Sequence, residues 1–129
     1  MKKVILVVED DRYVRENTIE MLEISGYEVL SAENGSLGYE VAMLRKPDLI
    51  LCDITMPETN GIIMLEKLRD NRATSEIPVV FFSAHSSIQS AMNDEIASAV
   101  SYLRKPFTHE ELMEVIEGGL GGDLQEFQN

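Results

Sequence analysis

Three acidic side chains follow directly on an apolar run near the start of the chain. Glu9, Asp10 and Asp11 come after the five apolar residues 4–8, VILVV, without a spacer. Neighbouring carboxylates repel one another, and holding them at the end of an apolar segment costs free energy unless a cation offsets their charge. Mg²⁺ is a hard cation that proteins usually bind through a few carboxylates together with phosphate oxygens. Asp11 is placed to be the N-cap of the helix that follows rather than a ligand, so Glu9 and Asp10 predict a magnesium site in front of a phosphate-bearing group.

Other polar side chains stand where further apolar runs end. Asp53 follows residues 48–52, Ser83 ends residues 78–83, and Lys105 comes shortly after a third run. An aspartate can attack phosphorus and form an aspartyl phosphate. A lysine ammonium and a serine hydroxyl can neutralise and hydrogen-bond the transferred group. We therefore predict Asp53 as a phosphoacceptor, with Lys105 and Ser83 beside the phosphoryl group.

The elements that must position these residues alternate along the chain. Apolar runs indicate strands, which we expect at residues 4–8, 27–32, 48–52, 78–83 and 100–103. Helical spacing and capping residues indicate helices, which we expect at residues 11–25, 34–46, 61–71, 86–99 and 108–118. This order is typical of an α/β domain with a doubly wound parallel sheet. Ligands of such sheets bind beyond the carboxyl ends of the strands, so the polar residues named above should converge there.

Four motifs in this chain carry a resemblance to a known family. They are VVEDD at 7–11, DxxMPxxxG at 53–61, FFSA at 81–84 and YLRKPF at 102–107. In this order and spacing, over roughly residues 2–118, they resemble the receiver domain of two-component response regulators. The resemblance implies a flavodoxin-like (βα)5 domain with a parallel five-stranded sheet of order 2-1-3-4-5. We expect this receiver domain at residues 1–118 and a flexible Gly-rich tail or the start of a linker at 119–129.

The resemblance also implies roles for individual residues. Asp53 is the phosphoacceptor, and Glu9 and Asp10 bind Mg²⁺, with Mn²⁺ as an alternative, together with Asp53 and the backbone carbonyl of Thr55. Lys105 pairs with the phosphate and precedes a cis bond to proline.

The same resemblance predicts how the signal is relayed. Ser83 and Tyr102 are switch residues that pass the change to the face formed by the fourth helix, the fifth strand and the fifth helix. His85 and Thr55 lie beside the phosphoryl group and are candidates for tuning its hydrolysis. The domain would catalyse its own phosphotransfer and dephosphorylation without being an enzyme.

The implied partners are proteins. The phosphoryl donor is a sensor histidine kinase or a histidine phosphotransfer protein, and an unknown output protein or domain reads the switched face. A homodimer through that face stays open. The net charge of −12 argues against binding of nucleic acid or of an anionic membrane. The single cysteine, Cys52, suits a reducing compartment, and we expect a bacterial cytoplasmic protein in which this thiol packs in the core.

Two other functions fit parts of the pattern. A receiver-like module that binds proteins without phosphorylation predicts loss of an acid, of the acceptor or of the lysine, and all of these are present. A metal-dependent phosphatase with an aspartyl nucleophile predicts a DxDxT motif, but Asp53 is followed by Ile54 and Thr55 without the second acid. No phosphate-binding glycine loop follows a strand, which disfavours a nucleotide-binding protein.

Overall fold

The computed structural model of the chain describes residues 2–54, 61–83 and 101–121. Five parallel strands form one sheet in the order β2-β1-β3-β4-β5, as predicted. The strands are β1 (Val4–Val8), β2 (Glu28–Ala32), β3 (Leu49–Asp53), β4 (Val79–Ser83) and β5 (Ser101–Arg104). The described helices are α1 (Arg12–Ile24), α2 (Gly35–Arg45), α3 (Gly61–Arg69) and α5 (His109–Leu120). The helix predicted at 86–99 lies outside the described residues.

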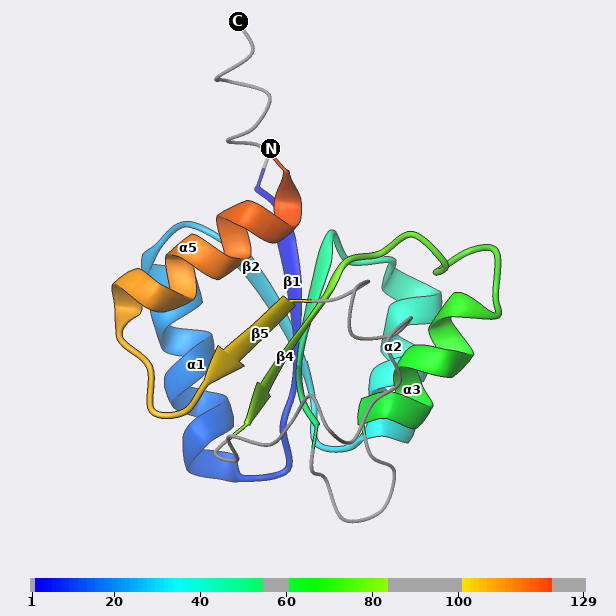
Figure 1. Ribbon diagram of the computed structural model, residues 1–129, viewed down its shortest axis with the longest axis horizontal. Helices are drawn as coiled ribbons and strands as arrows, with labels where there is room; N and C mark the ends of the chain where they lie inside the picture. The colour runs from blue at the N-terminus through cyan, green and yellow to red at the C-terminus, as the bar shows by residue number, and fades with distance from the viewer. Residues whose placement is uncertain (1, 55–60, 84–100, 122–129) are drawn as a thin grey trace, which may run out of the picture.

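Helices cover both faces of the sheet (Figure 1). The α1 and α5 helices lie on one face, and α2 and α3 lie on the other. Strands in the middle of such a sheet are buried on both sides, and all five residues of β3 are buried. This explains why β1, β3 and β4 read as unbroken apolar runs in the sequence.

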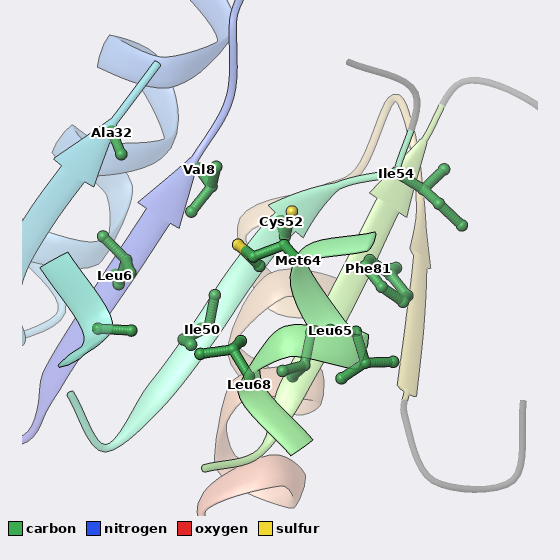
Figure 2. Packing of buried hydrophobic residues seen from close by; sticks show 12 residues of the cluster. Leu6, Val8, Ala32, Ile50, Cys52, Ile54, Met64, Leu65, Leu68 and Phe81 are labelled. Atoms are coloured by element: carbon green, nitrogen blue, oxygen red, sulfur yellow. The ribbon is translucent and has the colours of Figure 1, made fainter. Parts of the chain in front are cut away.

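Two apolar cores, one on each face, fix the strands in place. Under α2 and α3, side chains from several elements pack together, as Figure 2 shows for Val8, Cys52, Met64 and Phe81. Under α1 and α5, Phe82 of β4 belongs to the second cluster. Each large apolar side chain that is fully buried contributes about 1.5–3 kcal/mol. The strand ends that carry the polar residues are therefore held by a rigid support.

The described helices begin within one residue of the predicted starts, and a side chain caps α1, α2 and α5. Asp11 Oδ1 accepts from the backbone N–H of Val14 at 3.1 Å at the start of α1, as expected for an N-cap residue. At α5, Thr108 and Glu111 form a capping box in which each side chain accepts from the other's backbone N–H. Such caps each contribute about 1 kcal/mol.

The C-terminal end of α5 differs from the sequence prediction, which ended this helix at residue 118. The helix continues to Leu120, and Gly121 follows it with a left-handed φ of 72°. A Cβ on Gly119 would lie 2.5 Å from Cδ1 of Leu49, so a larger residue there would displace the Leu49 side chain. Gly119 therefore packs against the sheet, and Gly121 is the residue that ends the helix. The division into residues 1–118 and 119–129 stays a prediction.

No helix among the described residues is both long and apolar enough to cross a membrane.

Candidate metal and phosphoacceptor site

The carboxyl edge of the sheet, where β1, β3, β4 and β5 end, gathers the predicted site residues. Glu9 follows β1 directly, Asp53 is the last residue of β3, and Ser83 is the last residue of β4. Lys105 follows β5. The strand register places Asp53 beside Phe82 of β4. The convergence predicted from the ends of the apolar runs is thus present.

Three carboxylates face one another at this edge. Glu9, Asp10 and Asp53 each bring one oxygen within 4.8 Å of the other two. Glu9 is fully buried and Asp53 is 6% exposed, whereas Asp10 is exposed. Carboxylate oxygens gathered in this way are the ligands that Mg²⁺ prefers, so the donor set fits the predicted ion. Thr55, predicted to add a backbone carbonyl, lies outside the described residues.

Lys105 lies between two of these carboxylates. Its ammonium donates to Glu9 Oε1 at 2.7 Å and to Asp53 Oδ2 at 3.2 Å. The Lys105–Pro106 peptide bond is cis, as the family resemblance implied. The ammonium also lies 4.7 Å from the centre of the Phe82 ring, close enough for a cation–π attraction. Two carboxylates and one aromatic face therefore fix the position of the ammonium.

The protonation of Glu9 reflects its burial. Burial raises the pKa of Glu9 to about 7, although the hydrogen bonds that its carboxylate accepts from Lys105 and from the backbone N–H of Asp11 lower it. For Lys105, burial lowers the pKa, but the hydrogen bond to Glu9 and the charge of Asp53 outweigh burial, and the pKa is raised. Burial thus disfavours the charged form of Glu9, whereas the neighbouring carboxylates favour the charged form of Lys105.

The backbone around Asp53 is held by close packing. A Cβ on Gly61, the first residue of α3, would lie 2.7 Å from the Phe81 ring and 3.1 Å from the Asp53 carbonyl oxygen. Glycine at this motif position therefore lets α3 begin against the end of β3. The thiol of Cys52 is buried and donates to the Asp53 carbonyl at 3.3 Å. Burial raises its pKa, in agreement with the predicted packing role.

The predicted switch residues are described in part. Tyr102 lies in β5 and is half-buried, with its ring centre 6.5 Å from that of Phe81 at an interplanar angle of 36°. Burial raises the pKa of the Tyr102 hydroxyl. The backbone of Ser83 ends β4, but its side chain is not described. His85 lies outside the described residues.

Two residues near the site were missed by sequence reasoning. Arg15 donates from α1 to backbone carbonyls beside the acidic cluster. No sequence signal distinguishes Arg15 from Arg12, because both are cations at the positive end of the α1 dipole. Phe82 gave no signal, because an apolar residue in a buried strand is expected to be core.

Comparisons with known proteins agree with this geometry. The response regulator receiver domain family matches residues 5–117. PilH of Pseudomonas aeruginosa is 36% identical over 118 residues, which are 92% of this chain and 98% of PilH. The phosphate regulon transcriptional regulatory protein PhoB of the same organism is 37% identical over 111 residues, 86% of this chain and 48% of PhoB. The chain thus spans about half the length of PhoB.

Solved structures share the fold. A CheY-like response regulator receiver domain protein from Methanospirillum hungatei JF-1 matches over 100% of both chains with 29% identity and a TM-score of 0.84. The Vibrio cholerae chemotaxis protein CheY4 matches 92% of this chain and 99% of its own with a TM-score of 0.85 and 24% identity, a likeness of fold alone. With the family match across nearly the whole chain, these findings identify the protein as a member of the response regulator receiver domain family, a phosphoacceptor signalling switch.

Proposed function

We propose that Asp53 accepts a phosphoryl group from a phosphohistidine, with Mg²⁺ held by Glu9, Asp10 and Asp53 itself. The observation that carries this proposal is the meeting of three carboxylates with one ammonium at the carboxyl edge. A single buried ion pair would need only one carboxylate, and surplus buried charge is costly. The extra negative charge is explained if Mg²⁺ binds there together with a phosphoryl group.

The transfer itself balances in atoms and charge. An oxygen of Asp53 forms a bond to phosphorus, the bond from phosphorus to the donor's imidazole nitrogen breaks, and the imidazole leaves after taking up a proton. Such a transfer depends mainly on positioning and on neutralising charge. The Lys105 ammonium, 3.2 Å from an Asp53 oxygen, is close enough to neutralise a phosphoryl oxygen. We propose that the chain's own residues catalyse this step and the later hydrolysis.

The metal would be held by residues that already face one another. Glu9 is paired with Lys105, so an ion held by Glu9 would compete with this lysine and favour its pairing with the phosphoryl group. When bound, Mg²⁺ supplies charge neutralisation of phosphoryl oxygens. Mn²⁺ accepts the same oxygen ligands and is the alternative ion.

Ser83 and Tyr102 would relay phosphorylation to the surface. The half-buried Tyr102 ring rests on Phe81, the neighbour of Phe82 in β4, so a change at the end of β4 has a short path to β5. A shift between two packings of this kind is a population shift biased by a new charged group. The readout face would include β5 and α5, and His85 and Thr55 would tune the lifetime of the phosphate.

A groove beside the site favours a protein as the donor. A cavity of about 630 Å³ lies between α1 and the Lys105–Phe107 segment. Tyr13 on its rim is 86% exposed. A sensor histidine kinase or a histidine phosphotransfer protein could contact this groove while its phosphohistidine reaches Asp53. We also propose that an output protein or domain, or a second copy of this chain, binds the readout face, and that the protein works in the cytoplasm.

The proposal is tested by intact mass after incubation with phosphoramidate, a small donor with a phosphorus–nitrogen bond. We expect one added phosphoryl group on the wild type in Mg²⁺, and none in EDTA. Asp53→Asn should gain none. Asp48→Asn, the same chemical change at the opposite edge of the sheet, should be phosphorylated like the wild type.

The possible outcomes separate the functions. An adduct on Asp53→Asn equal to that on the wild type would mean that another residue is the acceptor. No adduct on any folded protein, with either metal, would favour the binding module that works without phosphorylation.

A further inference from the structure

Arg15 contacts the backbone that carries two of the three clustered carboxylates. Its guanidinium nitrogen Nη1 donates to the carbonyl oxygen of Glu9 at 2.8 Å and lies 3.4 Å from that of Asp10. Arg15 is half-buried in α1, and its own backbone N–H donates to the Asp11 carbonyl at 2.9 Å. One side chain thus spans the connection between β1 and α1.

Two further hydrogen bonds restrain this connection. The backbone N–H of Glu9 donates to the Ala32 carbonyl of β2 at 3.0 Å, and the N–H of Asp11 donates to Glu9 Oε2 at 3.0 Å. The carbonyls of Glu9 and Asp10 face the guanidinium instead. Arg15 therefore completes a set of restraints on the residues from which these carboxylates project.

Arg12 on the same helix provides the contrast. Its guanidinium pairs with Glu16 one turn further on, with both side chains more than half exposed. Such surface pairs contribute little. Arg15 instead donates to backbone carbonyls next to the site. The contacts with the Glu9 and Asp10 carbonyls explain why Arg15 lies at this position.

We propose that Arg15 is a positioning residue for the metal and phosphoacceptor site: its guanidinium holds the Glu9 and Asp10 carbonyls and thereby fixes the two carboxylates. The inference rests on the proposed function. Mg²⁺ demands nearly ideal octahedral geometry, so small displacements of its ligands weaken binding. Losing a residue that orients metal ligands typically costs about 10–100-fold in metal affinity.

Charge and positioning predict opposite effects for Arg15→Met. Removing a positive charge near a cation site should by itself strengthen Mg²⁺ binding, because repulsion falls. Losing the carbonyl contacts should weaken binding, and we expect this effect to dominate. Arg12→Met makes the same change in charge on the same helix without touching the carbonyls, so it reports the effect of charge alone.

The experiment is Mg²⁺ titration by calorimetry of the wild type, Arg15→Met, Arg15→Lys and Arg12→Met. We expect about tenfold weaker binding for Arg15→Met, an intermediate value for Arg15→Lys, which keeps one donor group, and binding equal to or tighter than wild type for Arg12→Met. Circular dichroism checks that each variant is folded. In EDTA, the amide proton of Asp11 should exchange with solvent faster in Arg15→Met than in wild type. Its exchange rate in Arg12→Met should equal that of wild type.

Equal Mg²⁺ affinity for Arg15→Met and Arg12→Met, with equal Asp11 exchange, would overturn the inference. Wild-type protein that binds no Mg²⁺ would instead contradict the proposed function. The exchange measurement in EDTA would then still decide whether Arg15 holds the connection.

Discussion

At the amino edge of the sheet, where the strands begin, charged side chains bond to the backbone of neighbouring elements. Asp48 precedes β3, and its Oδ2 accepts from the backbone N–H of Val4 in β1 at 2.7 Å. Arg69 at the end of α3 donates to the Ile77 carbonyl ahead of β4 at 2.8 Å. Asp48 thus joins the start of β3 to that of β1, and Arg69 joins the end of α3 to the segment ahead of β4.

At the carboxyl edge, charged side chains face one another instead. Glu9 and Asp53 are buried beside Asp10, with Lys105 as the cation that pairs with two of the three. The raised pKa of Glu9 records the cost of this arrangement. The comparison indicates that the amino edge uses charge for stability, whereas the carboxyl edge gives up stability for binding. Variants at the carboxyl edge should therefore lower or raise stability depending on which charge is removed, whereas a variant at the amino edge should only lower it.

Lys105→Met should have the largest effect on stability. It leaves Glu9 and Asp53 buried without their cation, and breaking such pairs costs several kcal/mol. Because the lysine is partly exposed, we expect the free energy of unfolding at pH 8 in EDTA to fall by about 2–3 kcal/mol. The loss should shrink toward pH 5, where Glu9 is protonated. Urea unfolding measures it, and Lys67→Met, at an exposed position of α3, is the control.

An equal loss for Lys105→Met and Lys67→Met would contradict the view that the carboxyl edge needs a cation.

Glu9→Gln should raise stability while it weakens metal binding. The pKa of Glu9 is raised from 4.5 to about 7 in the folded protein, so the folded state binds this proton more tightly. The contribution of Glu9 to the free energy of unfolding therefore falls as pH rises from about 4.5 to about 7. Glutamine stays neutral, so the variant should be more stable at pH 8 in EDTA by on the order of 2 kcal/mol.

Urea unfolding of Glu9→Gln and wild type between pH 4 and about 8 checks this window, with no difference expected at the acid end. Calorimetry should show weaker Mg²⁺ binding by the same variant. A variant less stable than wild type at pH 8 would mean that the pairing of Glu9 with Lys105 outweighs the cost of burial.

Asp48→Ala should show the smaller, purely structural effect of the amino edge. It removes the carboxylate that accepts from Val4, and losing such a bond costs about 1–2 kcal/mol. Urea unfolding should report this loss at pH 8, and Mg²⁺ affinity should equal that of wild type. A change in Mg²⁺ affinity would show that the two edges are coupled.

The sequence predicted the members of the site because their placement depends on few rules. Parallel strands end at one edge, so Glu9, Asp53 and Lys105 could be brought together from the ends of apolar runs alone. The sequence also distinguished Asp11 from the site residues, because its position before the first helix predicted an N-cap, which the structure confirms.

Contacts set by three-dimensional packing were not predictable. The sequence does not reveal that Lys105 pairs with Glu9 as well as Asp53, or that the Phe82 ring lies beside its ammonium. The end of α5 was placed two residues early because glycine usually stops helices, whereas Gly119 lies within the helix and packs against Leu49. Local rules decide strands and caps, but not which side chains meet across elements.

The central claim is that one particular carboxylate of the cluster, Asp53, accepts the phosphoryl group. Borohydride reduces an aspartyl phosphate to homoserine, so peptide mass after phosphorylation with phosphoramidate and Mg²⁺ identifies the acceptor. We predict homoserine at position 53 and unchanged aspartate at Asp10 and Asp48. Homoserine at another position, with Asp53 intact, would contradict the assignment.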